Sequence, residues 1–412
     1  MVFVLLVPFV IHAAWDYAET RRLGQSVARI RANREPLTSQ EIHSSHILAG
    51  EAADSARYYR AAAALAGSEI AEESATRIRA RVSDALWSGQ WPDSLVADLR
   101  ARVARDEDAY RLLDRATPLA FDGFGPGNLN ARIAEMLTLA RVAPLRTRLR
   151  AVDGDGNGAA ASLNAELRLQ RAFDVDPIPS DLSGFTIAGL ADSVGLIVNR
   201  SRPDAAALAL VAASLRDLDR DDRLKMHLMR ARASIFDNGI SQGTELLNTG
   251  RVQSLAGSAV LMRPWLMAML NERVETLGAL VEGANRPWPS RMDPPWSAHV
   301  SNSPTWGSSR VGDTWRMTSV GNDLASIRCA RAVVAIERYR LAHGQSLPSR
   351  IEDLVPSYLD AIPIDPFSGQ PLRFVAEQQG YVVYSFGLNR RDEGGRLSRR
   401  ESPDLGIRIS HR

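Results

Sequence analysis

The stretch CARAVVAIERYRLAHGQSLPSRIEDLVPSYLDAIPIDPFSGQPLRF, residues 329–374, decides the fold of the C-terminal part of the chain. It opens with apolar residues three and four positions apart, which indicates a helix. His343 and Gly344 end that helix, because glycine readily takes the left-handed backbone of a helix C-terminus. A turn that contains Pro and Gly follows, and the next residues alternate as a strand does. The chain therefore changes from helix to strand within this passage.

A long helix is predicted from about residue 315 to 343. It is apolar over much of its circumference, so we expect other elements to surround it. The only cysteine, Cys329, lies within it, which excludes an intrachain disulfide and favours a buried small side chain over a reactive thiol. The predicted buried side chains are Ala325, Cys329, Ala332, Val333, Ile336 and Tyr339, with Ile327, Val334 and Leu341 beside them.

A short helix at SRIEDLVP and a β-hairpin that turns near Gly380 are predicted after the long helix. Together they form a small α+β unit. The last residues, 390–412, carry many charges and are predicted to be a solvated tail rather than a phosphate-binding arm.

The residues before this unit have the pattern of stacked short helices. Thr38 or Ser39 can cap the first of them, with Glu41 in its first turn, and Gly89 lies where a helix C-terminus is expected. Between about 130 and 235 the helices pair into hairpins that weakly resemble tetratricopeptide-type repeats.

The glycine-rich segment DGDGNG, residues 153–158, lies between two of these helices and matches the opening of a calcium-binding EF-hand loop. Such a loop needs a glutamate at its twelfth position, where this chain has Asn164. We therefore interpret the segment as a polar turn.

The predicted fold is mainly α, with an N-terminal anchor helix, a body of stacked helical hairpins and a small C-terminal α+β domain. The predicted ranges are 1–20 for the anchor or signal segment, 36–285 for the helical hairpins, 286–314 for a Pro-, Trp- and Ser-rich connection, and 315–412 for the α+β domain.

The first residues, MVFVLLVPFVIHAA, form an apolar run that Trp15 and Tyr17 extend with aromatic side chains typical of a membrane interface. We predict an uncleaved anchor in the inner membrane with a single pass and with the bulk of the chain in the periplasm or outside the cell. A cleaved signal peptide and a buried N-terminal helix are the alternatives. Arg21 and Arg22 follow the run while no basic residue precedes it, which favours the opposite orientation.

The order of elements after residue 315 resembles the globular part of the major pseudopilins of type II secretion systems. The matching pieces are Tyr339-Arg340, His343-Gly344, Pro348, Asp365-Pro366-Phe367, Gly369, Pro371, Tyr384-Ser385, Gly387, Gly394-Gly395 and Asp404-Leu405. Nothing near residue 1 resembles the processing site of that family, so assembly into a pilus by its mechanism is not expected.

The resemblance implies a calcium site in the last loop, whose counterparts here are Asn389, Asp392 and Asp404. Carboxylate and carbonyl oxygens are the ligands that calcium prefers. Arg390 and Arg391 interrupt this loop and oppose a cation. The alternative is a turn without metal.

Two functions remain from the sequence. The first is a non-enzymatic envelope protein, attached to the membrane by its N-terminal segment, that binds other envelope proteins and is linked to secretion or pilus-like machinery. The second is a hydrolase-type enzyme that uses His43, His46 and carboxylates such as Glu41 or Glu51. The sequence contains no G-x-S-x-G, H-E-x-x-H or phosphate-binding glycine loop, which favours the first.

A nucleic-acid partner is not expected. The formal net charge is only +2, and acidic residues accompany the basic ones along the predicted helices.

Overall fold

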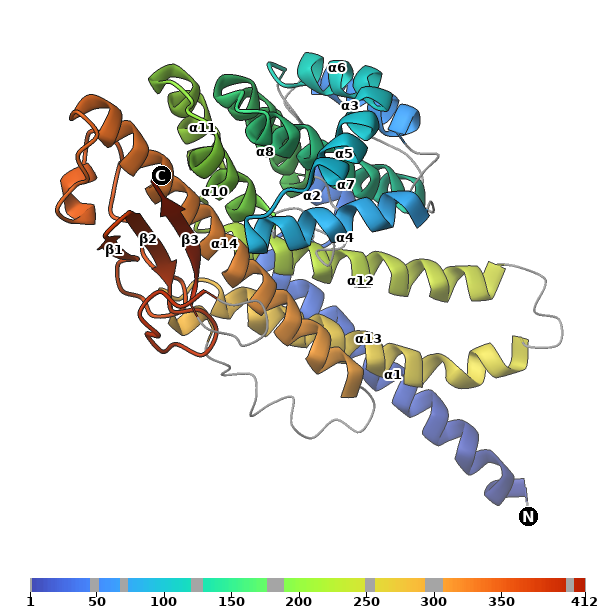
Figure 1. The fold of residues 1–412 in the computed structure, drawn as a ribbon. Helices are drawn as coiled ribbons and strands as arrows, with labels where there is room; N and C mark the ends of the chain where they lie inside the picture. The colour runs from blue at the N-terminus through green and yellow to red at the C-terminus, as the bar shows by residue number, and fades with distance from the viewer. Residues whose placement is uncertain are drawn as a thin grey trace. The chain divides into compact units, whose positions relative to one another are not determined.

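The computed structural model describes residues 2–44, 52–66, 73–119, 129–175, 189–248, 256–292, 307–397 and 404–411 (Figure 1). It is mainly helical with one small antiparallel sheet near the C-terminus, which confirms the predicted fold class. Its contacts divide the chain into two compact units. Unit 1 contains the described parts of Met1–His46 and Asp222–Trp315, and unit 2 those of Ile47–Asp176, Asp181–Asp221 and Arg316–Arg412.

Unit 1 is built around helix α13, which packs against α1 on one side and α12 on another. A short apolar cluster of Ile30, Leu37, Phe236, Leu270 and Val274 fills the space between them. The helices are α1 (Val2–Ala32), α2 (Ser39–Ser44), α12 (Arg223–Asn248) and α13 (Ala256–Gly283), with a 3-10 turn at η4 (Ser290–Met292).

Helix α2 begins with the predicted capping residues. The Thr38 hydroxyl accepts a hydrogen bond from the Glu41 backbone N–H at 3.2 Å, and the Glu41 carboxylate accepts one from the Leu37 N–H at 2.9 Å. These bonds satisfy N–H groups that a helix start leaves without partners. Arg232 of α12, 1% exposed, donates to Glu35 at 2.8 Å and holds the chain just before this cap.

Unit 2 contains most of the short helices. Helix α7 is its centre: it contacts α3, α5, α8 and α10, and α8 in turn contacts α11. The helices are α3 (Ala52–Ala66), α4 (Glu73–Ser88), α5 (Asp93–Arg105), α6 (Glu107–Ala116), α7 (Leu129–Val152), α8 (Gly156–Val175), α10 (Leu190–Arg200) and α11 (Ala205–Leu218). Gly89, with φ of +69°, follows the end of α4, as its position in the sequence predicts.

The predicted polar turn lies between α7 and α8. Gly154 has a φ of +81°, which the chain needs to reverse its direction and which glycine adopts without strain. The Asp155 carboxylate then accepts the Gly158 N–H at 2.9 Å. Asp155 therefore caps the start of α8, and the segment is a turn between paired helices.

Helix α14 (Gly307–Ala342) starts earlier than predicted, and the boundary between the two units falls within it. In unit 2 its predicted stripe is buried: Ala325, Cys329, Ala332, Val333 and Ile336 are each 0% exposed. The prediction for Leu341 is wrong, because this side chain is 42% exposed in the last turn of the helix. Gly344, with φ of +60°, follows that turn as predicted.

The sheet follows α14 after a 3-10 turn, η6 (Ile351–Leu354). Its strands are β1 (Arg373–Glu377), β2 (Gly380–Ser385) and β3 (Leu405–Ser410), antiparallel in the order β1-β2-β3. Glu377 pairs with Gly380, so the hairpin turns where the sequence predicts. The predicted solvated tail is wrong for β3, because Ile407 and Ile409 are buried and the strand pairs with β2 along its length.

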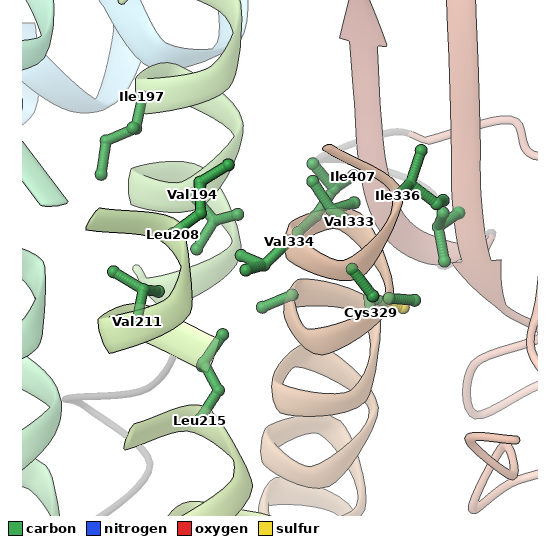
Figure 2. Packing of buried hydrophobic residues seen from close by; sticks show 14 of the residues in the cluster. Val194, Ile197, Leu208, Val211, Leu215, Cys329, Val333, Val334, Ile336 and Ile407 are labelled. Atoms are coloured by element: carbon green, nitrogen blue, oxygen red, sulfur yellow. The ribbon is translucent and has the colours of Figure 1, made fainter. Parts of the chain in front are cut away.

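One continuous apolar core joins the sheet to the helices of unit 2. Figure 2 shows side chains of α10 and α11, such as Val194 and Val211, across from Val333 and Val334 of α14, with Ile407 of β3 beyond. Gly195 of α10 permits this approach, since a Cβ there would lie 3.2 Å from Ile407 Cγ2. The range 315–412 therefore shares its core with helices of the predicted hairpin body, and that body is distributed over both units.

Candidate functional site

The loop between β2 and β3 contains the three residues for which the pseudopilin resemblance implies a calcium site. Asp392 Oδ1 accepts the Tyr384 hydroxyl and the Gly394 N–H, both at 2.9 Å. Asp404 accepts the Gly395 N–H at 2.7 Å. The Asn389 side-chain oxygen accepts the Arg391 N–H at 2.9 Å. Each of the three side chains thus accepts an N–H of the loop itself.

Several carboxylates lie close together in this loop, and an arginine lies near them. Burial and the neighbouring Glu393 and Asp392 carboxylates raise the pKa of Asp404. Glu393 Oε2 is buried with no hydrogen-bond partner among the described residues, and Arg373 Nε lies 3.6 Å from Asp392 Oδ2. A bound cation would relieve this repulsion and give the Glu393 oxygen a partner.

The described residues do not, however, gather three or more His, Cys, Asp or Glu side chains into one group that could hold a metal ion. Calcium would have to replace N–H donors at Asp392 and Asp404 before it could bind both. The loop is therefore a turn held by hydrogen bonds to its own side chains. A metal ion could bind only after some of these hydrogen bonds were broken.

Asp365, from the DPF piece of the resemblance, fixes the start of the same region. Its carboxylate is 1% exposed and accepts Ser385 Oγ at 2.6 Å, Ser368 Oγ at 2.7 Å and the Phe367 N–H at 3.1 Å. Asp365 therefore ties the turn before β1 to the end of β2, which is a structural role.

The alternative enzyme site falls largely outside the described residues. His46, Glu51 and the side chain of His43 are not among them. Glu41 binds Arg31 at 2.7 Å in addition to the Leu37 N–H, and these bonds lower its pKa. Glu41 is thus held as a capping anion, and the described geometry brings no further group of the predicted enzyme site to it.

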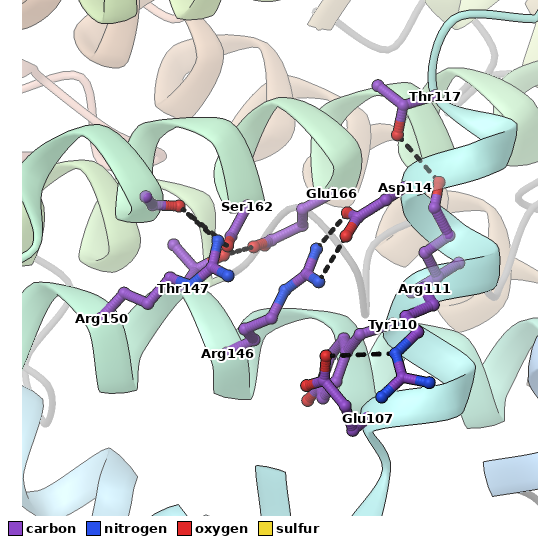
Figure 3. Close-up of polar contacts among 12 residues, drawn as sticks. Glu107, Tyr110, Arg111, Asp114, Thr117, Arg146, Thr147, Arg150, Ser162 and Glu166 are labelled. Atoms are coloured by element: carbon purple, nitrogen blue, oxygen red, sulfur yellow. Dashed lines mark hydrogen bonds and ion pairs between the residues drawn. The ribbon is translucent and has the colours of Figure 1, made fainter. Parts of the chain in front are cut away.

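A polar cluster that the sequence did not reveal lies between α6, α7 and α8 (Figure 3). Arg146 of α7 binds Asp114 of α6 at 2.8 Å and lies over the Tyr110 ring, 4.7 Å from its centroid. The Tyr110 hydroxyl donates to the Val142 carbonyl at 2.8 Å. These contacts tie α6 to α7 and give the buried Tyr110 hydroxyl a partner.

Glu166 of α8 lies in the same cluster, and its pKa is shifted towards neutrality. Burial raises its pKa from 4.5 to about 7, while Arg148 and a 3.4 Å hydrogen bond from Thr147 act in the opposite direction. A carboxyl group with this pKa is half protonated near neutrality. Its helical context, a glutamate within an Ala- and Leu-rich segment, gives no sign of this in the sequence.

The first helix exposes large apolar side chains at its N-terminal end. Phe9, Val10 and Ile11 are between 63% and 67% exposed, and Trp15 and Tyr17 follow one turn later at 42% and 69%. Helix α13 contributes Met262, Trp265 and Leu266, which are 36% to 46% exposed. None of the helices within the described ranges has an apolar stretch long enough to cross a membrane.

Polar contacts fix the two helices side by side and in parallel. Asp16 pairs with Arg263, Asn271 donates to Glu19 at 2.9 Å, and Arg22 donates to Glu275 at 2.8 Å. Residue numbers rise together along both helices in these pairs. Trp265 of α13 therefore lies near the level of Asp16 and continues the apolar side chains of α1 onto a second helix. We call Val7, Phe9, Val10, Ile11, Trp15, Met262, Trp265 and Leu266 the apolar end of unit 1.

Comparison with models of protein families, with curated proteins and with solved structures finds no match to this chain.

Proposed function

We propose that the protein is a non-enzymatic cell-envelope protein, attached to the inner membrane through α1 with the bulk of the chain in the periplasm, that acts by binding other envelope proteins. A link to secretion or pilus-like machinery is part of this proposal, through the likeness of residues 315–412 to pseudopilins. The observation that carries it is the exposure of large apolar side chains on α1.

Exposed apolar groups of this size favour an apolar environment. Transfer of one such side chain out of water is worth roughly 1.5–3 kcal/mol, so Phe9, Val10 and Ile11 together supply several kcal/mol towards attachment. Scattered exposed apolar residues are ordinary on soluble proteins, but a contiguous set marks an interaction surface. In this chain Phe9, Val10 and Ile11 belong to the apolar run of residues 1–14.

The residues next to this set match the chemistry of a membrane interface. Trp15, Tyr17 and Trp265 have an apolar ring with a polar atom, as interfacial aromatic residues do. Arg21 follows one turn later, where it would meet the headgroups of anionic lipids, whereas Arg22 is paired with Glu275. Membrane attachment would therefore use both the apolar side chains and the basic Arg21 of α1.

Flotation of the purified full-length protein with vesicles of anionic phospholipid tests this proposal. We expect the protein to float with the vesicles and the double variant Phe9→Asp/Ile11→Asp to remain at the bottom of the gradient. Leu65→Asp is the matched control, because Leu65 on α3 of unit 2 is 57% exposed and lies outside the apolar end of unit 1. Flotation of the α1 variant like the wild type would contradict attachment through α1.

A further inference from the structure

A groove in unit 2 is lined by α11, α14 and the segment after η6, and its volume is about 350 Å³. This size lies at the lower end of the range for ligand pockets. Its lining includes Ala212, Ala213 and Arg216 of α11, Arg331 and Arg338 of α14, and Tyr358.

Small side chains line one side of the groove, and a ring packed against its neighbours lines the other. The small alanine side chains of α11 leave room for a ligand on one side. On the other side, the centroid of the Tyr358 ring lies 5.7 Å from that of Tyr339 and 6.3 Å from that of His343. Tyr358 is therefore held in place by its neighbours, so a ligand would meet a wall that is already ordered.

One of the three arginines in the groove is already neutralised. Arg331 pairs with Asp219 and with Asp360, and Asp219 also accepts a hydrogen bond from Arg328 at 3.0 Å. These pairs fix the end of the groove near Asp360. They leave Arg331 with little capacity for a further anion.

The other two arginines have no carboxylate partner among the described residues. Arg216 is exposed, and Arg338 lies over the Tyr358 ring with 5.6 Å between its guanidinium carbon and the ring centroid. Their acidic neighbours in sequence are engaged elsewhere: Glu337 binds Arg340 at 2.7 Å, and Asp217 lies 3.9 Å from Arg168. The groove therefore carries surplus positive charge on two different helices.

We propose that this groove binds an acidic, extended segment of a partner protein. The inference rests on the proposed function, because it gives the chemistry of the protein that is bound. A guanidinium binds a carboxylate through two parallel hydrogen bonds. Arg216 and Arg338 come from different helices, which suits carboxylates at separate positions along one chain, while the alanines and Tyr358 contact its apolar parts.

Fluorescence anisotropy of a labelled hexaglutamate peptide with the full-length protein tests the proposal. We expect hexaglutamate to bind and labelled hexaserine not to bind. The variants Arg216→Glu and Arg338→Glu should each weaken binding at least about tenfold, since each replaces an attraction by a repulsion. Arg202→Glu is the matched control, because Arg202 is an exposed arginine of unit 2 outside the groove, and it should leave binding unchanged.

Arg216→Gln and Arg338→Gln serve as milder variants if either charge reversal unfolds the protein, and circular dichroism checks folding in each case. Equal loss of binding in Arg202→Glu would overturn the proposal, because any surface arginine would then suffice. Displacement of the peptide by an equal concentration of inorganic phosphate would also overturn it, since the groove would then bind small anions without selecting a peptide.

The vesicle flotation assay on the same variants separates this inference from the proposed function. Groove variants that float normally and fail to bind hexaglutamate support both. A wild-type protein that floats and does not bind hexaglutamate refutes the groove alone. A wild-type protein that binds hexaglutamate and does not float refutes membrane attachment alone.

Discussion

At the scale of single residues, Glu166 gives the clearest prediction. Its pKa is raised to about 7 in the folded protein, against 4.5 as an ordinary value, so the folded state holds the proton more tightly than the unfolded state. The stability that this group contributes is complete below pH 4.5 and is lost as the pH rises towards 7, by about 3 kcal/mol in total.

Urea unfolding of the wild type and of Glu166→Gln between pH 5 and 8 measures this effect. We expect the variant to gain stability relative to the wild type as the pH rises. The exposed Glu352→Gln is the control and should follow the wild type. A constant difference between Glu166→Gln and the wild type over this range would contradict the raised pKa.

The loop of Asn389, Asp392 and Asp404 gives a second prediction at this scale. Calcium would relieve the repulsion at Asp404 but must displace N–H donors, so we expect weak binding at about 10⁻⁴–10⁻³ M, the range of extracellular modules. Thermal unfolding should shift upwards with calcium at such concentrations and not with magnesium. Asp392→Asn should abolish the shift. If calcium does not shift the unfolding of the wild type, the loop is a turn that binds no calcium.

Single residues were predictable where the rule is local. The Thr38 and Glu41 cap depends on neighbours in sequence, and the structure confirms it. Glu166 was not predictable, because its burial depends on how α7 packs against α8. Arg216 and Arg338 also gave no signal in the sequence, since their proximity is created by helices more than 100 residues apart in the chain.

At the scale of elements, β3 changes the interpretation of the C-terminus. Its side chains alternate, with Ile407 and Ile409 buried and Arg408 and Ser410 exposed. We expect Ile409→Ala to lower the free energy of unfolding by about 2–4 kcal/mol, because it removes a buried branched side chain. Ser410→Ala should leave the free energy nearly unchanged. Chemical unfolding of both variants checks this, and equal effects would contradict the burial of the strand.

The sequence could not predict β3, because the contacts that stabilise this strand are long-range. Charged residues precede it, and only two isoleucines mark its buried face. Its pairing with β2 and its contact with α10 decide its state, and neither is local. The hairpin of β1 and β2 was predictable, because its two strands and its glycine turn are close together in the sequence.

At the scale of the whole molecule, the periodicity of the helices predicts the fold class but not the grouping of its parts. Helix α10 lies far before residue 315 in the chain, yet it packs against β3 in a core shared with α14. Helices with similar amphipathic sequences thus belong to different units, because long-range contacts that no local pattern encodes decide the grouping. The apolar start of the chain, by contrast, could be recognised directly from the sequence.

Attachment to the inner membrane with the bulk of the chain in the periplasm is the central claim for the whole molecule. Fractionation of cells, followed by protease digestion of intact cells and of spheroplasts, tests it most directly. We predict that the full-length protein is recovered with the inner membrane and that unit 2, which contains the C-terminal residues, is cleaved only in spheroplasts. Recovery in a soluble fraction, or protection of that unit in spheroplasts, would contradict the account.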